Sequence, residues 1–286
     1  MRHAWWETLL FRAGIAWCAW QTMAGPLPYA SLPRPHGMAH WVDVTFAGNA
    51  ETMKWVSALV GLCLTLYVCK VAVRLVLLPP LLVSIAMGAL ENSQGAINHT
   101  SQVVTLVLLA HWLSAVWLTI RRWFRARPPG SLTREQHAAD WTRQVFISTY
   151  VVSAISKLVE SRGLWLRDTP YFGLQIIKSM GMAKYGDTGA GQNVQWLAQF
   201  ALDHPWVFRL FLGVALPLEL FAFLALLNRR LALVFGCALL AFHVVNTEVM
   251  HLGFYYHKAL LVVLFINPVW WLVQGVKRAG RVHAAA

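Results

Sequence analysis

Apolar runs of bilayer-spanning length constrain this chain more than any other feature. A membrane-spanning helix needs about 20 consecutive, mostly apolar residues. Apolar residues fill 58% of the 286 positions, whereas charged residues fill only 13%, so a soluble globular domain and a disordered chain are excluded. The pattern predicts an all-α, polytopic membrane bundle of about eight transmembrane helices, forming one domain over 1–286. The expected spans are 5–24, 52–69, 71–90, 102–120, 141–158, 207–227, 231–250 and 256–275.

The first expected span is the weakest because it carries Glu7 and Arg12. An interfacial helix is the alternative for this run. The later prolines, Pro79, Pro80 and Pro217, are expected to kink their helices, because proline removes a backbone donor and clashes with the preceding turn.

The charge distribution predicts the orientation. The net charge is +12, which in a soluble protein would suggest nucleic acid. In a membrane protein, basic residues gather in cytoplasmic loops, so we expect membrane lipid and no nucleic acid as partner. With the N-terminus inside, fourteen Lys and Arg residues lie inside and nine outside, and six arginines crowd the loop 121–143. We therefore expect an integral membrane protein with both termini cytoplasmic.

The connection 159–206 is expected to lie outside as an amphipathic segment. Asp168-Thr169-Pro170 is typical of a helix start, with a capping oxygen followed by proline at the first helical position. Trp196, Leu197 and Phe200 indicate a second short helix. Both are expected to lie on the outer membrane surface.

Ionisable residues at membrane depth are costly and point to function. Near the end of the fifth expected span, Thr149, Ser153 and Lys157 recur at helical spacing, with Tyr150 beside them. They form one polar stripe on that helix. Lys157 has two open readings, as a snorkelling interface residue or as a desolvated base.

Further polar groups lie near the outer ends of other spans. Asn98 and His99 open the fourth span, where a helix cap and a surface histidine are the simplest interpretation. His243 lies deep in the seventh span with Asn246 one turn away, and Glu219 is a buried acid in the sixth that we expect to pair with Arg12. Because an HExxH spacing and paired Cys/His clusters are both missing, we expect no metal site.

Four blocks of the sequence resemble the vitamin K-dependent gamma-carboxylase family, in the broad sense that includes bacterial HTTM-domain membrane proteins. The blocks occur in the family's order and approximate spacing. They are Leu9-Leu10-Phe11-Arg12-Ala13-Gly14, Ile97-Asn98-His99-Thr100, Ile155-Ser156-Lys157-Leu158 with Trp165, and Phe242-His243-Val244-Val245-Asn246-Thr247-Glu248 with Leu252-Gly253.

The resemblance implies a quinol-dependent enzyme. In the family, a lysine deprotonates vitamin K hydroquinone, which reacts with O2 to give a strong base and an epoxide. That base removes a glutamate γ-proton, and CO2 then adds. Matched motif by motif, Lys157 takes the lysine role and His99 the assisting histidine role. Asn98, Tyr150, Trp165, His243 and Asn246 are then expected to bind the quinol, with Glu219 and Arg12 in support.

The implied cofactor is a reduced vitamin K or menaquinone-type quinol, with O2 and CO2 as co-substrates. The acceptor is a glutamate of a secreted peptide or protein, or another substrate. The site is expected to face the outer side of the membrane, which agrees with the charge count. Two alternatives stay open. One is a non-catalytic scaffold or accessory factor for a secreted peptide, in which the same residues are structural hydrogen bonds. The other is a b-type cytochrome, because membrane histidines also bind haem.

Overall fold

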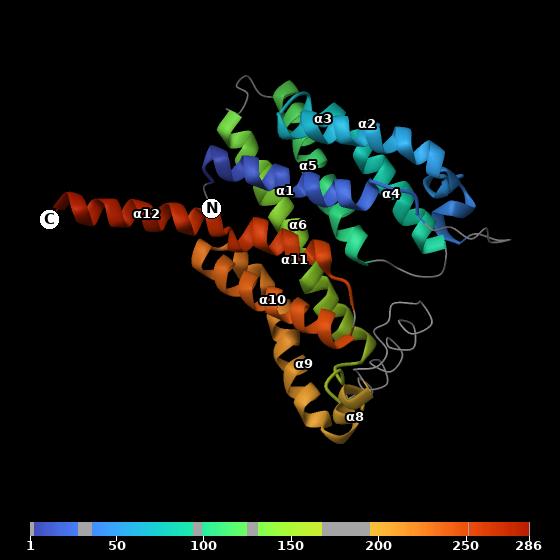
Figure 1. The fold of residues 1–286 in the computed structure, drawn as a ribbon, viewed down its shortest axis with the longest axis vertical. Helices are drawn as coiled ribbons and strands as arrows, with labels where there is room; N and C mark the ends of the chain where they lie inside the picture. Colours follow the sequence, from blue (N-terminus) through green and yellow to red (C-terminus); the bar gives the residue numbers. More distant parts are fainter. Residues whose placement is uncertain are drawn as a thin grey trace. The chain divides into compact units, whose positions relative to one another are not determined.

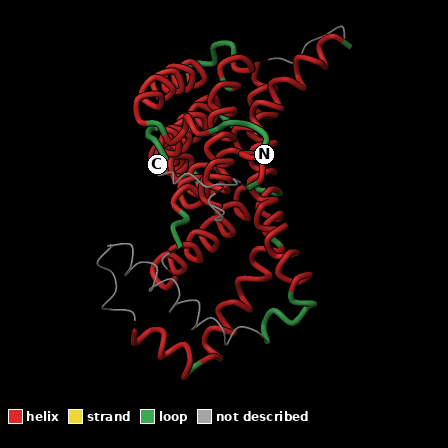
Figure 2. Tube along the Cα trace, turned by 90° about the vertical axis from the view of Figure 1, so that its right-hand side faces the viewer, coloured by secondary structure: helices red, strands yellow, loops and turns green. Residues whose placement is uncertain are grey.

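The fold is all-helical, as the sequence predicts. The computed structural model describes residues 3–27, 36–93, 99–124, 131–167, 195–250 and 252–285. Every regular element within these ranges is a helix, and Figure 2 draws no strand among them.

Five helical stretches among the described residues are long and apolar enough to cross a membrane. They match five of the eight expected spans, which confirms the class of protein, by length and composition, but not the number of crossings. The three other runs are also helical, but each is either too short or not apolar enough to meet the same criterion. The five stretches are Ala50–Val68, Val73–Ser93, His99–Arg121, Arg229–Val249 and Tyr255–Ala279.

The contacts divide the chain into two compact units. Unit 1 comprises 1–146 and 262–286, and unit 2 comprises 147–261. The division falls inside α6, Ser131–Glu160, which supplies residues to both. The other elements of unit 1 are α1 (Trp5–Met23), η1 (Gly37–His40), η2 (Thr45–Gly48), α2 (Ala50–Val68), α3 (Val73–Val76), α4 (Leu78–Ser93), α5 (His99–Trp123), the π-turn η6 (Val262–Ile266) and α12 (Pro268–Ala285). The other elements of unit 2 are α8 (Gln195–Asp203), α9 (Pro205–Leu220), η5 (Ala222–Leu226), α10 (Arg229–Met250) and α11 (Tyr255–Leu261).

Helix α1 packs against α2, α4 and α5 in unit 1 (Figure 1). Its buried face includes Ile15 and Ala19, which are almost inaccessible. Glycines permit two close approaches. A Cβ atom on Gly14 would lie 2.8 Å from a methyl group of Val263, and one on Gly61 would lie 2.9 Å from the Trp20 ring. A side chain at either position would therefore require the neighbouring side chain to shift.

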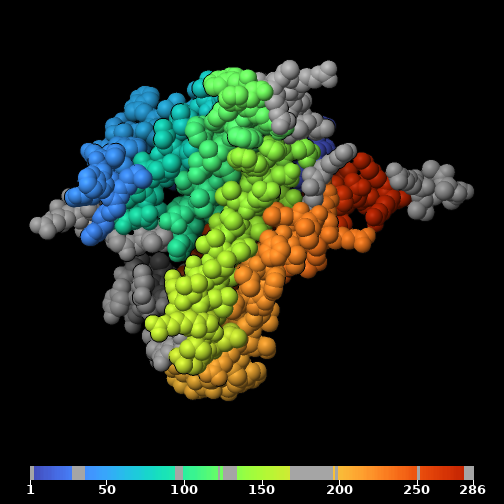
Figure 3. Space-filling view, turned by 180° about the vertical axis from the view of Figure 1, so that it is seen from behind, coloured from blue at the N-terminus to red at the C-terminus, as the bar shows by residue number. Residues whose placement is uncertain are grey.

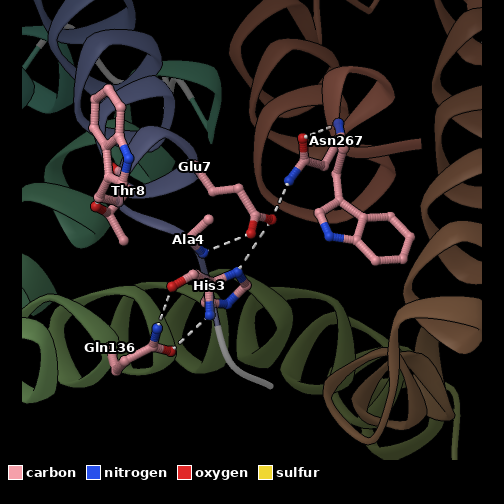
Figure 4. A network of polar contacts seen from close by, with 8 residues as sticks. His3, Ala4, Glu7, Thr8, Gln136 and Asn267 are labelled. Atoms are coloured by element: carbon pink, nitrogen blue, oxygen red, sulfur yellow. Dashed lines mark hydrogen bonds and ion pairs between the residues drawn. The ribbon is translucent and has the colours of Figure 1, made fainter. Parts of the chain in front are cut away.

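The first turn of α1 is fixed by a buried polar network (Figure 4). The Glu7 carboxylate accepts the Ala4 N–H at 2.7 Å and the Asn267 amide at 2.8 Å. Gln136 exchanges hydrogen bonds with the backbone N–H and C=O of His3, at 3.0 and 2.6 Å. Glu7 thus satisfies helix-terminal donors and ties α1 to the junction before α12, which explains how an acidic residue is tolerated in an apolar run.

Several expected boundaries were wrong. Helix α6 begins at Ser131, so much of the expected loop 121–143 is helical, and α12 continues to Ala285. Polar residues extend both helices beyond their apolar stretches, and hydropathy alone does not detect such extensions. The short helix expected around Trp196 is confirmed as α8. The helix start at 168–170 lies outside the described residues.

The three prolines lie close to helix ends. Pro79 and Pro80 lie in the first turn of α4, just after the break that separates it from α3. There a missing N–H costs little, because the first turn has no intrahelical acceptor for it. Pro217 lies inside α9, which ends three residues later at Leu220 before the 3-10 turn η5.

Candidate functional site

A buried tyrosine–histidine pair joins two helices of unit 2. The Tyr150 hydroxyl of α6 and the Nε2 atom of His243 in α10 lie 2.8 Å apart. Both residues are at least 95% buried. The yellow-green surface of α6 runs beside the orange surface of α10 in Figure 3, in agreement with this bond. Two residues that the sequence singled out separately therefore belong to one interhelical contact.

Aromatic rings surround His243. The centroid of the Phe254 ring lies 4.5 Å from that of His243, and the His257 ring centroid lies 5.4 Å from it. His257 also meets the Tyr150 ring edge-on at 6.2 Å. The Nδ1 atom of His243 is buried and has no hydrogen-bond partner within the described part of the chain. Sequence reasoning missed Phe254 and His257, although a histidine inside an apolar run was an available signal.

The end of α10 is held by a second set of polar contacts. The Thr247 hydroxyl lies 2.8 Å from the His243 carbonyl and 3.1 Å from the Leu252 carbonyl. The Lys258 ammonium donates to the same hydroxyl at 3.1 Å. Asn246, which directly precedes Thr247 on α10, is 6% exposed. Lys258 is a further cation that sequence reasoning did not place near His243.

Lys157 forms an ion pair with Glu219 of α9. The Glu219 side chain is 6% exposed and the Lys157 side chain 26% exposed, so the pair is buried on one side and open on the other. The Lys157 ammonium also lies 5.8 Å from the centroid of the Trp165 ring, within cation–π range. Lys157 and Trp165, which are eight residues apart in the sequence, are therefore also neighbours in space.

The expected Arg12–Glu219 pair is wrong. The Arg12 Nη1 atom donates to both carboxylate oxygens of Glu135, at 2.9 and 2.8 Å, and Glu219 binds Lys157 instead. Sequence reasoning placed Glu135 in a loop, so it was not considered. Once α6 begins at Ser131, Glu135 lies on an ordered helical turn and can reach the arginine.

The apolar residues that precede Lys157 on α6 differ in their exposure. Val152 and Ile155 are 59% and 47% exposed, whereas Tyr150 and Ala154 are buried. The buried face of α6 therefore follows Tyr150 and Ala154, with Lys157 next along the helix at the i+7 position from Tyr150. Val152 and Ile155 point away from the ion pair, in positions suited to lipid.

His99 is the first residue of α5 and belongs to unit 1. It is exposed, and its Nδ1 atom lies 3.4 Å from Oε1 of Gln102. Asn98 lies outside the described residues. The convergence of these two residues with Lys157 remains a prediction, whereas Tyr150, Lys157, Trp165, Glu219, His243 and Asn246 all belong to unit 2.

Chemically, unit 2 offers an ammonium–carboxylate pair and a neutral donor–acceptor pair among aromatic rings. These groups can hold and transfer protons and can hydrogen-bond a polar ring substituent. Within the described ranges, no three His, Cys, Asp or Glu residues are arranged to hold a metal ion. Comparison of the chain with family models, with curated proteins and with solved structures finds no match.

Proposed function

We propose that this chain is an integral inner-membrane enzyme of the vitamin K-dependent gamma-carboxylase type, which uses a reduced quinone. In this proposal all eight apolar helical runs cross the bilayer, with both termini cytoplasmic and the site toward the outer side. One observation carries the proposal: unit 2 holds both the Lys157–Glu219 ion pair and the buried Tyr150–His243 pair.

The residues fit the ring of a quinol. Quinol hydroxyls need hydrogen-bond partners, and the ring needs apolar or aromatic surfaces. Tyr150 and His243 supply hydrogen-bonding atoms, while Phe254 and Trp165 supply aromatic faces. The partly exposed Lys157 side chain is open to a ligand that enters from the lipid or the surface. When bound, the quinol supplies the strong base with O2, and CO2 is the second co-substrate.

The Lys157–Glu219 pair is proposed as the proton acceptor. Such a pair can exist as ammonium and carboxylate or as amine and carboxylic acid, which differ by one proton on the contact between Nζ and Oε2. The neutral amine then accepts a proton from the bound hydroxyl, while Glu219 keeps the first proton.

The assisting roles follow the family motif. His99 is proposed as the assisting histidine and Asn98 as its neighbour in quinol binding. Asn246 is proposed to orient the ring from the turn after His243. The acceptor of the carboxyl group is proposed to be a glutamate of a secreted peptide or another carbon acid.

The test uses the purified full chain in lipid nanodiscs with reduced menaquinone or vitamin K and O2. We expect oxygen uptake and quinone epoxide with the unaltered chain. Lys157→Ala and Lys157→Arg should both lose at least 99% of the activity, because arginine stays protonated. Lys54→Ala is the matched control, since Lys54 is exposed and forms an ion pair with Glu51, which is also exposed. Epoxide formation that survives both Lys157 substitutions in folded protein would remove the proposed base.

A non-catalytic scaffold for a secreted peptide is the second candidate. It is favoured by the way the polar groups pair with one another, because interhelical hydrogen bonds also stabilise membrane bundles. The two functions differ in one result. A scaffold with Lys157 replaced by methionine and Glu219 by glutamine keeps its peptide partner, whereas the enzyme loses its turnover.

A further inference from the structure

Unit 1 contains a cationic pocket that the proposed function does not use. Its volume is about 410 Å³, within the range of small-ligand sites. It is lined by residues of α1, α3, α5 and α6 and of the turn before α3. Figure 1 shows α3 beside α5 in this unit. The pocket therefore has a floor of helix side chains and a rim formed by a short connection.

The charge of the pocket is strongly positive. Four cations line it, namely Arg12, Lys70, Arg74 and Arg134, against the single carboxylate of Glu135. That carboxylate is shared, because Arg12 lies 2.8 Å and Lys70 3.5 Å from its oxygens. The lining therefore holds more cationic than anionic side chains, which favours an anion as ligand.

Unused donors lie at the floor of this pocket. Arg12 is 2% exposed, and although its Nη1 atom binds Glu135, its Nε and Nη2 atoms have no partner among the described residues. Ser114 is fully buried, and its hydroxyl also has no partner in the described part of the chain. Buried donors of this kind are costly when unsatisfied. Two residues of the same lining thus carry unsatisfied donors.

The rim is held in an unusual backbone conformation. Lys70 and Ala72 both have positive φ angles, 64° and 40°, although neither is glycine. Such a conformation is disfavoured for residues with a side chain and tends to persist where a site requires it. Lys70 lines the pocket, and its ammonium lies 3.5 Å from the carboxylate that Arg12 also binds.

We propose that this pocket binds a phosphate monoester that carries an organic group. Phosphate offers several oxygens to guanidinium forks and hydroxyls, and its charge offsets most of the excess. The apolar lining includes Val73 and Leu118 and suits the carbon portion of such an ester. A bare inorganic ion would leave this apolar part of the pocket unfilled. The phosphate can come from the head group of an acidic phospholipid or from a soluble phosphate ester.

Two probes separate these sources. Phosphatidic acid and sn-glycerol 3-phosphate share the phosphate monoester and differ in the acyl chains. The full chain is delipidated in detergent, and binding is measured by native mass spectrometry for the lipid and by calorimetry for the soluble ester. Saturable binding of phosphatidic acid above that of phosphatidylcholine indicates a lipid site, and binding of glycerol 3-phosphate indicates a soluble ligand. Either result supports the proposal, and binding of neither overturns it.

Variants locate the binding. Arg74→Gln at the exposed edge and Ser114→Ala in the buried part of the lining should both lower the affinity for the bound probe. The arginine substitution should lower it by about tenfold, because it removes a charge-assisted hydrogen bond. Lys54→Gln is the matched control, because it removes one exposed positive charge at the other end of α2. An equal loss of affinity in Lys54→Gln and Arg74→Gln would show non-specific charge attraction and overturn the pocket assignment.

Discussion

Breaking the Lys157–Glu219 pair should destabilise the protein by an amount that depends on its partial burial. Removing one partner of a fully buried ion pair costs about 3–5 kcal/mol, whereas an exposed pair contributes about 0–1 kcal/mol. The two side chains are 26% and 6% exposed, so this pair falls between the limits. We expect Glu219→Gln and Lys157→Met each to cost about 2 kcal/mol.

A double-mutant cycle isolates the interaction from other effects of each change. The double variant removes both charges, so it should cost less than the sum of the single variants, with a coupling of about 1–2 kcal/mol. Equilibrium unfolding of the full chain in mixed detergent micelles, followed by circular dichroism, measures each corner of the cycle. The control cycle uses Lys54 and Glu51, whose side chains are 70% and 72% exposed. Additive single effects at Lys157 and Glu219, or equal couplings in the two cycles, would refute the argument from burial.

Three more outcomes are expected. A cysteine at position 190 in a cysteine-free background should react with an impermeant thiol reagent on intact cells and one at position 130 should not, as the charge distribution predicts; the opposite pattern would reverse the topology. Gly14→Ala should lower the free energy of unfolding by about 1–3 kcal/mol, because its Cβ would lie 2.8 Å from a neighbouring methyl group. Gly88→Ala has open space around the added Cβ, so it should raise the free energy of unfolding by about 0.5–1 kcal/mol. Equal effects of the two substitutions on unfolding would contradict this packing. Tyr150→Phe should cost about 1 kcal/mol in the same assay, because it removes the hydroxyl bonded to the α10 histidine, and an unchanged stability would show that this bond contributes nothing.

The helical class and several site residues could be predicted from the sequence. Long apolar runs admit only helices when backbone donors must be satisfied without water, so every expected span is helical even where its ends were misplaced. Tyr150, Lys157 and His243 stand out for a related reason. A polar side chain in an apolar run must find a partner, and that requirement is visible without knowing the partner.

The partners themselves were decided by the tertiary structure. Lys157 and Glu219 are 62 residues apart, and Tyr150 and His243 are 93 apart, so no local spacing connects them. The choice of Glu135 as the partner of Arg12 required α6 to begin at Ser131, which apolar periodicity does not predict. Likewise, Val152 and Ile155 face outward because the packing of α6 determines its rotation about its own axis. The hydropathy of a segment depends only on residues that are close in the sequence, so it can be calculated from the sequence alone. The pairing of polar side chains depends instead on the directions in which distant helices present them.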